Sequence, residues 1–172
     1  MTTVTQPLRD EHKELIPHIE ALRTAADAVG DVPPPTLRTR IDESYDFLTH
    51  HLIPHAQAEE RALYPVVGKV LGAPAATRTM SRDHVEVGRL VDQLRALRAQ
   101  VPTAGPDNAQ VKDLRRILYG LYALVSVHFA KEEEVYLPLL DEGLLADDAL
   151  RMFEEMEKAA AQAKVEANAG GR

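Results

Sequence analysis

Two segments of the chain repeat the same spacing of a histidine, a glutamate and a proline. His55 is followed four residues later by Glu59, and His128 is followed four residues later by Glu132. A proline stands ten residues after each of these histidines. Because residues i and i+4 lie on one face of a helix, each pair aims an imidazole and a carboxylate at the same point. Two such pairs on two helices can hold a pair of metal ions.

The repeat extends to two further histidines, His12 and His84. They lie 72 residues apart, and the two His-Glu pairs lie 73 residues apart. Each follows a short charged run with an arginine and an aspartate, and each is followed by apolar residues at helical spacing. This internal duplication predicts two helical hairpins in tandem. Each hairpin contributes one histidine from its first helix and a histidine plus a glutamate from its second.

Composition narrows the class of protein and the donor atoms of any metal site. The chain has 172 residues, of which 45% are hydrophobic and 27% charged, as in one globular domain. Its net charge of −7 argues against a nucleic-acid partner, and no apolar run is long enough to span a membrane. Without cysteine, a metal must be bound by nitrogen and oxygen. The first residues show no signal-peptide pattern, so we expect a cytoplasmic protein.

Apolar residues spaced three and four apart predict helices and no strand. These stripes cover residues 8–26, 41–59, 84–94, 114–139 and 145–160, and the fourth includes Val135 near its end. Gly30 with the following prolines, and the segment 102–108, mark the turns. The fold class is therefore all-α, an up-down-up-down four-helix bundle with an additional C-terminal helix. We expect the bundle to occupy residues 1–143. Residues 144–172 would form an amphipathic helix and a frayed tail, from residue 166, packed on the same domain.

The inward stripes of the second and fourth helices are interrupted by the His-Glu pairs. A buried carboxylate is costly unless it is paired or bound to a metal, so either a buried ion pair or a metal site is required. One His-x3-Glu segment is weak evidence, but two copies with a histidine on each remaining stripe favour a metal. No histidine has a glutamate three residues before it, unlike the ferritin-like pattern. The imidazole-rich set suits iron, zinc or copper, and two shared carboxylates favour paired iron.

At residues 7–140 the sequence resembles a hemerythrin-like (HHE cation-binding) domain. The resemblance rests on the four histidines, the two Glu-Glu pairs and the proline after each pair. It implies two non-heme iron ions joined by an oxo or hydroxo bridge. By this resemblance His12 and His55 bind one iron, His84 and His128 bind the other, and Glu59 and Glu132 bridge both.

Two positions depart from the invertebrate oxygen carriers of that family. Gly88 stands where those carriers have a fifth histidine, which leaves one iron less saturated. Glu133 stands at their carboxylate position in the fourth helix, but the stripe places Glu132 inward, and we prefer Glu132. An extra ligand from His51, His18 or Glu133 remains an alternative. We expect His18 and His51 to lie beside each other between the first two helices.

The leading functional hypothesis is a protein that binds a small oxidant, namely dioxygen, peroxide or nitric oxide. Its enzymatic form would be catalase- or peroxidase-like breakdown of peroxide. The competing hypothesis is a metal- or oxygen-sensing interaction module without catalysis, and a structural zinc protein is the third. The expected partner is a small diatomic or peroxide ligand, with no nucleic acid and no membrane, and the sequence names no protein partner.

Overall fold

The computed structural model describes residues 3–170, and every regular element in that range is helical. The prediction of an all-helical protein is therefore confirmed. The elements are α1 (Gln6–Ala28), α2 (Pro34–Phe47), η1 (Leu48–Leu52), α3 (Ile53–Ala58), η2 (Glu59–Leu63), α4 (Tyr64–Val70), α5 (Arg78–Gln100), α6 (Asn108–Lys131), η3 (Glu132–Tyr136), α7 (Leu137–Gly143) and α8 (Ala146–Gly170). The elements η1, η2 and η3 are π-helical turns.

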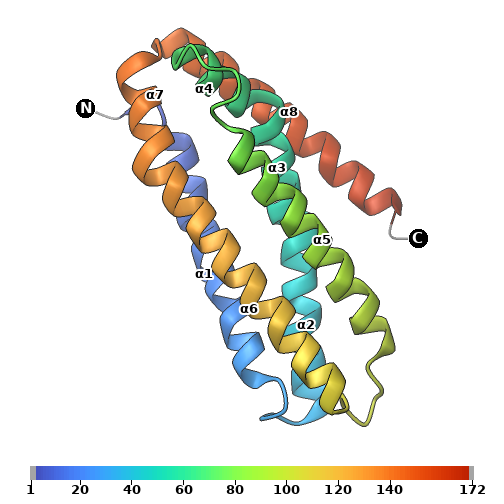
Figure 1. Cartoon of the computed structure of the whole chain (residues 1–172). Helices are drawn as coiled ribbons and strands as arrows, with labels where there is room; N and C mark the ends of the chain where they lie inside the picture. The colour runs from blue at the N-terminus through green and yellow to red at the C-terminus, as the bar shows by residue number, and fades with distance from the viewer. Residues whose placement is uncertain (1–2, 171–172) are drawn as a thin grey trace.

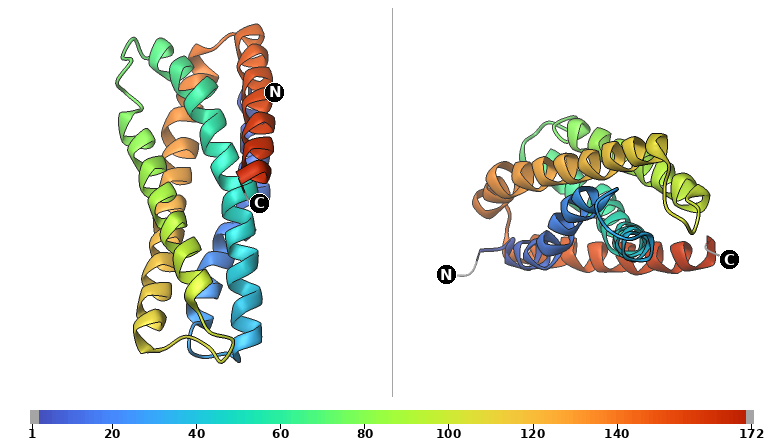
Figure 2. Two further views of the ribbon diagram at one scale, coloured as in Figure 1. Left: turned by 90° about the vertical axis from the view of Figure 1, so that its right-hand side faces the viewer. Right: turned by 90° about the horizontal axis from the view of Figure 1, so that it is seen from below.

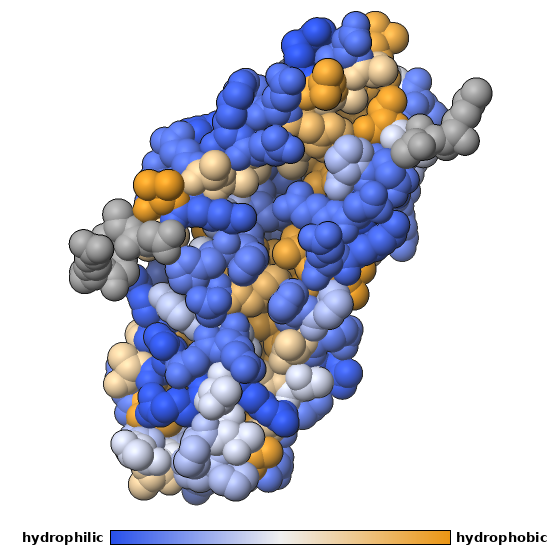
Figure 3. Space-filling model, turned by 180° about the vertical axis from the view of Figure 1, so that it is seen from behind, coloured by the Kyte–Doolittle hydropathy of each residue, from blue (hydrophilic) through white to orange (hydrophobic). Residues whose placement is uncertain are grey.

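Four long helical segments lie side by side, and consecutive segments run in opposite directions (Figure 1). The second segment is continuous from α2 to α4, and the fourth is continuous from α6 to α7. α1 packs on α6 and α2, and α5 packs on α6 and α2. Figure 2 shows these segments from two further sides, with α8 along one side of them. None of the helices within residues 3–170 has the length and apolar character needed to cross a membrane. The face of the molecule shown in Figure 3 is mainly hydrophilic, with smaller hydrophobic areas among the polar side chains.

A polar layer separates two apolar cores along the length of the bundle. One core is built around residues such as Leu22, Leu48, Leu94 and Leu118, and the other around residues such as Leu63. Each long segment contributes to both cores. His12, His55 and His84 stand between the two contributions of their segments, whereas Phe129 of the first core follows His128. Packing in the two apolar cores therefore fixes the relative positions of the helices on both sides of the polar side chains.

α8 lies against α3 and η2, the part of the second segment that carries His55 and Glu59. Its buried face includes Met152 and Met156, which join the second core. Leu145, which the sequence placed on this buried face, is 73% exposed, so that expectation was wrong. Its place immediately before α8 leaves its side chain outside the helix contact. α8 continues to Gly170, although fraying was expected from residue 166, and residues 171 and 172 lie outside the described range.

Each π-helical turn ends two residues before a proline. η1, η2 and η3 precede Pro54, Pro65 and Pro138 in this way. A proline has no N–H for the i−4 carbonyl and its ring crowds that carbonyl, so the wider turn relieves a clash in a continuing helix. An inserted π turn also shifts the helix face by one residue, and such turns are frequent at functional sites. Two of the three begin at Glu59 and Glu132.

The one-residue shift of the helix face at η3 makes one detail of the predicted fourth apolar stripe wrong. Val135 was expected to point inward, but its side chain is 49% exposed, and Leu137 is fully buried in its place. The periodicity of an ordinary α-helix does not hold across η3, because the turn contains an extra residue.

This register can be tested by a matched pair of substitutions. Leu137→Ala leaves a cavity and should lower the free energy of unfolding by about 2–5 kcal/mol. Val135→Ala should cost less than about 1 kcal/mol, because that side chain is half in solvent. Denaturant titration of the two metal-free variants measures both values. An uninterrupted α-helix predicts the reverse order.

Candidate metal centre

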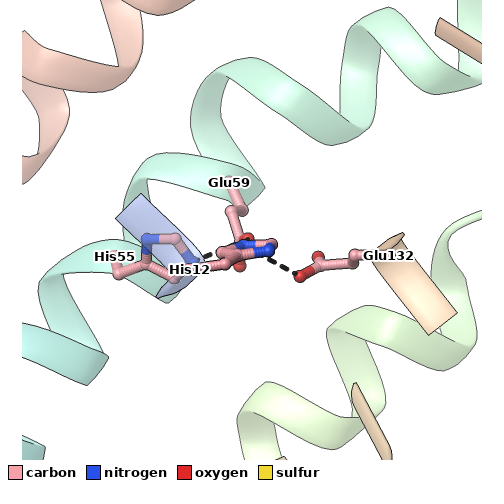
Figure 4. A group of neighbouring side chains, drawn as sticks. All are labelled: His12, His55, Glu59 and Glu132. Carbon is pink, nitrogen blue, oxygen red and sulfur yellow. Dashed lines mark ion pairs between the residues drawn. The ribbon is translucent and has the colours of Figure 1, made fainter. Parts of the chain in front are cut away.

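The first group of donor atoms comes from α1, α3, η2 and η3. Figure 4 shows the carboxyl groups of Glu59 and Glu132 directed toward the ring of His12, with His55 beside Glu59. Glu59 Oε1 lies 3.0 Å from His55 Nε2 and 4.0 Å from His12 Nε2. Glu132 Oε2 lies 3.6 Å from His12 Nε2. All four side chains are buried, and the four donor atoms lie within 4.8 Å of one another, close enough to bind one metal ion.

A second group of donor atoms shares Glu59 with the first. Glu59 Oε2 lies 3.2 Å from His84 Nε2 and 3.9 Å from His128 Nε2. The two oxygens of Glu59 therefore face different pairs of histidines. Glu132 behaves similarly, since its Oε1 lies 3.4 Å from His128 Nε2 while its Oε2 faces His12. Two carboxylates that each face both histidine pairs have the geometry of bridges between two ions.

The four histidines all direct Nε2 into the site and bind an acidic side chain through Nδ1. The distances from Nδ1 to the carboxylate oxygen are 2.7 Å for His12 with Glu133, 3.0 Å for His55 with Glu11, 2.8 Å for His84 with Glu60 and 3.1 Å for His128 with Asp83. A carboxylate that accepts the Nδ1–H fixes the tautomer and leaves Nε2 with a lone pair for a metal. The arrangement follows the internal repeat, because each hairpin supplies one partner to itself and one to the other hairpin.

Tyr64 breaks this symmetry. Its hydroxyl donates to Glu132 Oε1 at 3.0 Å and lies 3.2 Å from His128 Nε2 and 3.3 Å from His84 Nε2. The position 73 residues later, equivalent in the repeat, is Leu137, which has no polar atom in its side chain. A phenol oxygen therefore stands at the second donor group, and the first group has none from the equivalent position.

The residues pass a direct test of whether they fit a metal. Among the described side chains, both oxygens of Glu59, one oxygen of Glu132 and the Nε2 atoms of His12 and His55 are buried without a hydrogen-bond partner. A buried polar atom without a partner costs roughly 1–3 kcal/mol, and more for a charged group. Arg115 Nε, away from the site, is the one other such atom among the described residues. The remaining five belong to the donor groups, so a cation there would satisfy them together.

Burial and crowding of charge set the protonation of the metal-free site. Burial and the nearby charge of His55 lower the pKa of His12. Burial alone would lower the pKa of His55, but the Glu59 carboxylate outweighs it and raises this pKa well above its usual range. Burial alone would also lower the pKa of His128, but the carboxylates of Glu132 and Glu59 outweigh it and raise this pKa to about 10. At neutral pH His55 and His128 therefore carry protons that a metal must displace.

The pKa values of the two central carboxyl groups, Glu59 and Glu132, shift in opposite directions. Burial and then the charge of Glu59 raise the pKa of Glu132 to about 7. Burial would also raise the pKa of Glu59, but the surrounding histidines, His55 first, hold it well below its usual range. Like charges this close do not both ionise freely, so Glu59 keeps its charge and Glu132 retains a proton more readily.

The structure brings together all six side chains that the sequence singled out as metal ligands. His12, His55, Glu59, His84, His128 and Glu132 share the two donor groups. Glu133 is absent from both and binds His12 Nδ1 instead.

The expected pairing of His18 and His51 is confirmed. Their rings are stacked with centroids 6.4 Å apart, and neither belongs to the donor groups found among the described residues.

Sequence reasoning assigned no role to Tyr64 or to three acidic residues, Glu11, Glu60 and Asp83. The acidic residues carried a signal, because each stands next to a proposed ligand in the chain. Which histidine each one would meet could not be read from that adjacency, since the contact is with a histidine on another helix in every case. Tyr64 belongs to the motif, but its contact with Glu132 depends on how two distant helices meet.

Comparison with known proteins agrees with this geometry. Residues 3–140 match the sequence profile of the family described as hemerythrin HHE cation binding domain. Neither curated proteins nor solved structures give a significant match to the chain. The matched range covers α1 to α6 and ends within α7, so it contains every residue of the two donor groups. The chain belongs to the hemerythrin HHE cation-binding family.

Proposed function

We propose that the protein is a non-heme di-iron protein that binds a small oxidant at the centre of an up-down-up-down four-helix bundle with an additional C-terminal helix. The observation that carries the proposal is the position of Glu59, whose two oxygens face two separate pairs of histidines. A carboxylate placed in this way supports a pair of ions rather than a single one. Nitrogen and oxygen donors rich in imidazole favour iron over magnesium or calcium.

His12 and His55 would hold one iron, and His84 and His128 the other. Glu59 and Glu132 would bridge the two, with an oxo or hydroxo group between the ions. The Tyr64 hydroxyl lies close enough to the second pair of histidines to be a further donor there. When bound, the iron pair supplies redox chemistry and exchangeable coordination positions for dioxygen, peroxide or nitric oxide.

The side chains around the ions have distinct tasks. The four outer carboxylates hold the imidazole Nδ1–H groups and thereby orient Nε2. The apolar cores on either side exclude bulk water and large polar substrates. This arrangement suits a small reactant rather than an organic substrate. The reaction proposed for the iron-loaded protein is therefore the breakdown of peroxide.

Metal analysis, an absorption spectrum and a peroxide assay test the proposal together. We expect about two irons per chain and near-ultraviolet bands of a bridged iron pair, which zinc does not show. Peroxide breakdown should be lost in His128→Ala. The matched control is His50→Ala, a histidine outside the donor groups that bonds the backbone of its own helix. Stoichiometric zinc without iron would overturn the proposal.

Tyr64→Phe tests the asymmetry between the two donor groups. If the phenol oxygen binds a ferric ion, a visible tyrosinate band should be present in the parent and absent in the variant. The iron content should stay near two per chain, because the histidines and bridging carboxylates remain. A spectrum that does not change on this substitution would limit Tyr64 to its hydrogen bond with Glu132.

A metal- or oxygen-sensing module without catalysis is the second candidate. The observation in its favour is the packing of α8 on α3 and η2, which carry His55 and Glu59. A change in metal occupancy would act directly on the surface that α8 covers. Iron-loaded protein that binds azide but leaves peroxide untouched would favour this candidate over an enzyme.

A further inference from the structure

We propose that small ligands enter through a groove between α1 and α6, and that Phe129 is the gate at its inner end. This inference rests on the proposed function and goes beyond it by assigning a route and a residue that limits access. The groove has a volume of about 480 Å³. Its lining includes His12, a member of the first donor group, so the groove leads to the site.

Phe129 forms the boundary between the groove and the donor atoms. Its side chain lines the groove but is only 6% exposed. Its ring centroid lies 4.4 Å from that of His12, 5.7 Å from His55 and 6.4 Å from His128. This one aromatic side chain thus lies beside three of the four imidazoles, and His12 among them lines the groove. A molecule moving inward from the groove must displace this ring or pass its edge.

The internal repeat shows that this cover is not a general feature of the motif. The position equivalent to Phe129 in the first hairpin is Ala56, which follows His55 as Phe129 follows His128. An alanine side chain cannot cover a neighbouring imidazole. The aromatic cover is therefore present at one of two equivalent positions, and it is the one at which the groove reaches His12.

The chemistry of the groove suits small molecules without a net charge. Ile16, Ile19 and Ala130 supply apolar walls. Charged side chains at the rim of the groove already have partners. Arg9 forms an ion pair with Glu133 at 2.5 Å, and Glu20 accepts a hydrogen bond from Tyr122 at 3.1 Å. Dioxygen, nitric oxide and peroxide can cross such a surface without losing a strong partner. Phe129 then limits the size of the molecules that pass from the groove to the donor atoms.

Two substitutions change the route in opposite directions. Phe129→Leu shortens the gate while keeping an apolar side chain. Ile16→Trp narrows the mouth at a residue that is 48% exposed, where a larger side chain does not disturb the core. Val85→Trp is the matched control, because Val85 is 64% exposed on α5 and does not line the groove.

The first measurement is the rate at which nitric oxide, an uncharged ligand, binds to the reduced iron-loaded proteins, followed by stopped-flow absorption. We expect Phe129→Leu to raise the rate severalfold and Ile16→Trp to lower it about tenfold, as for a gated route. Val85→Trp should stay within about twofold of the parent, and iron content should be equal in all four proteins.

The second measurement requires no metal. Diethyl pyrocarbonate modifies accessible imidazoles, and mass spectrometry gives its rate at His12 relative to the exposed His18. The rate at His12 should rise in Phe129→Leu and fall in Ile16→Trp. Unchanged nitric oxide binding rates and unchanged modification rates in both variants would overturn the gate. Failure to bind iron would overturn the proposed function alone, because the modification rates still decide the route.

Discussion

Glu59→Ala is expected to abolish the paired metal site and not merely one of its ions. Glu59 is completely buried, and its oxygens lie 3.0 Å from His55 Nε2 and 3.2 Å from His84 Nε2, one in each donor group. Removal of this side chain takes one donor from each ion and the link between them. Iron should fall from about two to well below one per chain, and the bands of the bridged pair should disappear.

Three further variants make this result interpretable. Glu59→Gln keeps the side-chain volume but removes the charge, and it should also lose the pair, which separates ligation from packing. Glu134→Ala removes an exposed glutamate outside both donor groups and should keep the parental iron content. Glu132→Ala should resemble Glu59→Ala, since Glu132 also faces both histidine pairs. Retention of two irons and an unchanged spectrum in both Glu59→Ala and Glu132→Ala would rule out bridging by these residues.

Metal affinity is expected to rise steeply with pH. In the metal-free protein the carboxylates of Glu132 and Glu59 raise the pKa of His128 to about 10, so His128 is protonated at pH 7–9. The Glu59 carboxylate also raises the pKa of His55 well above its usual range. Metal binding requires the deprotonated imidazole and must release these protons. With the His128 proton released, affinity should increase at least about 10-fold per pH unit in this range. Below pH 7 the proton on Glu132 adds to the dependence, so acid should strip the metal.

The metal-free protein should respond to pH in the opposite sense. The raised pKa of His128 contributes stability that is complete below about pH 6.5, the pKa of an unfolded histidine, and is lost as pH rises through about 10. Stability without metal should therefore fall between pH 7 and 10 while metal affinity rises. Chelator competition and thermal unfolding at each pH measure the two trends. An affinity independent of pH would contradict protonated ligands in the metal-free site.

The sequence by itself determined the helices and the choice of ligand side chains. Spacings of three and four residues predicted the long helices, and the same spacing placed each histidine and glutamate on the buried face. These properties are local, because the period of a helix depends only on its own backbone. His12, His55, Glu59, His84, His128 and Glu132 could be selected on this basis, and the structure places all six at one level of the bundle.

The tertiary structure decided the features that depend on how helices meet. The contact of Tyr64 with Glu132 joins residues 68 positions apart, and that of Glu133 with His12 joins residues 121 positions apart. The exposure of Val135 and the burial of Leu137 depend on a π-helical turn that periodicity does not encode. The groove that ends at Phe129 exists only where α1 and α6 come together. Such contacts are fixed by packing between helices, whose relative rotation and height are set by the whole core rather than by any local run of residues.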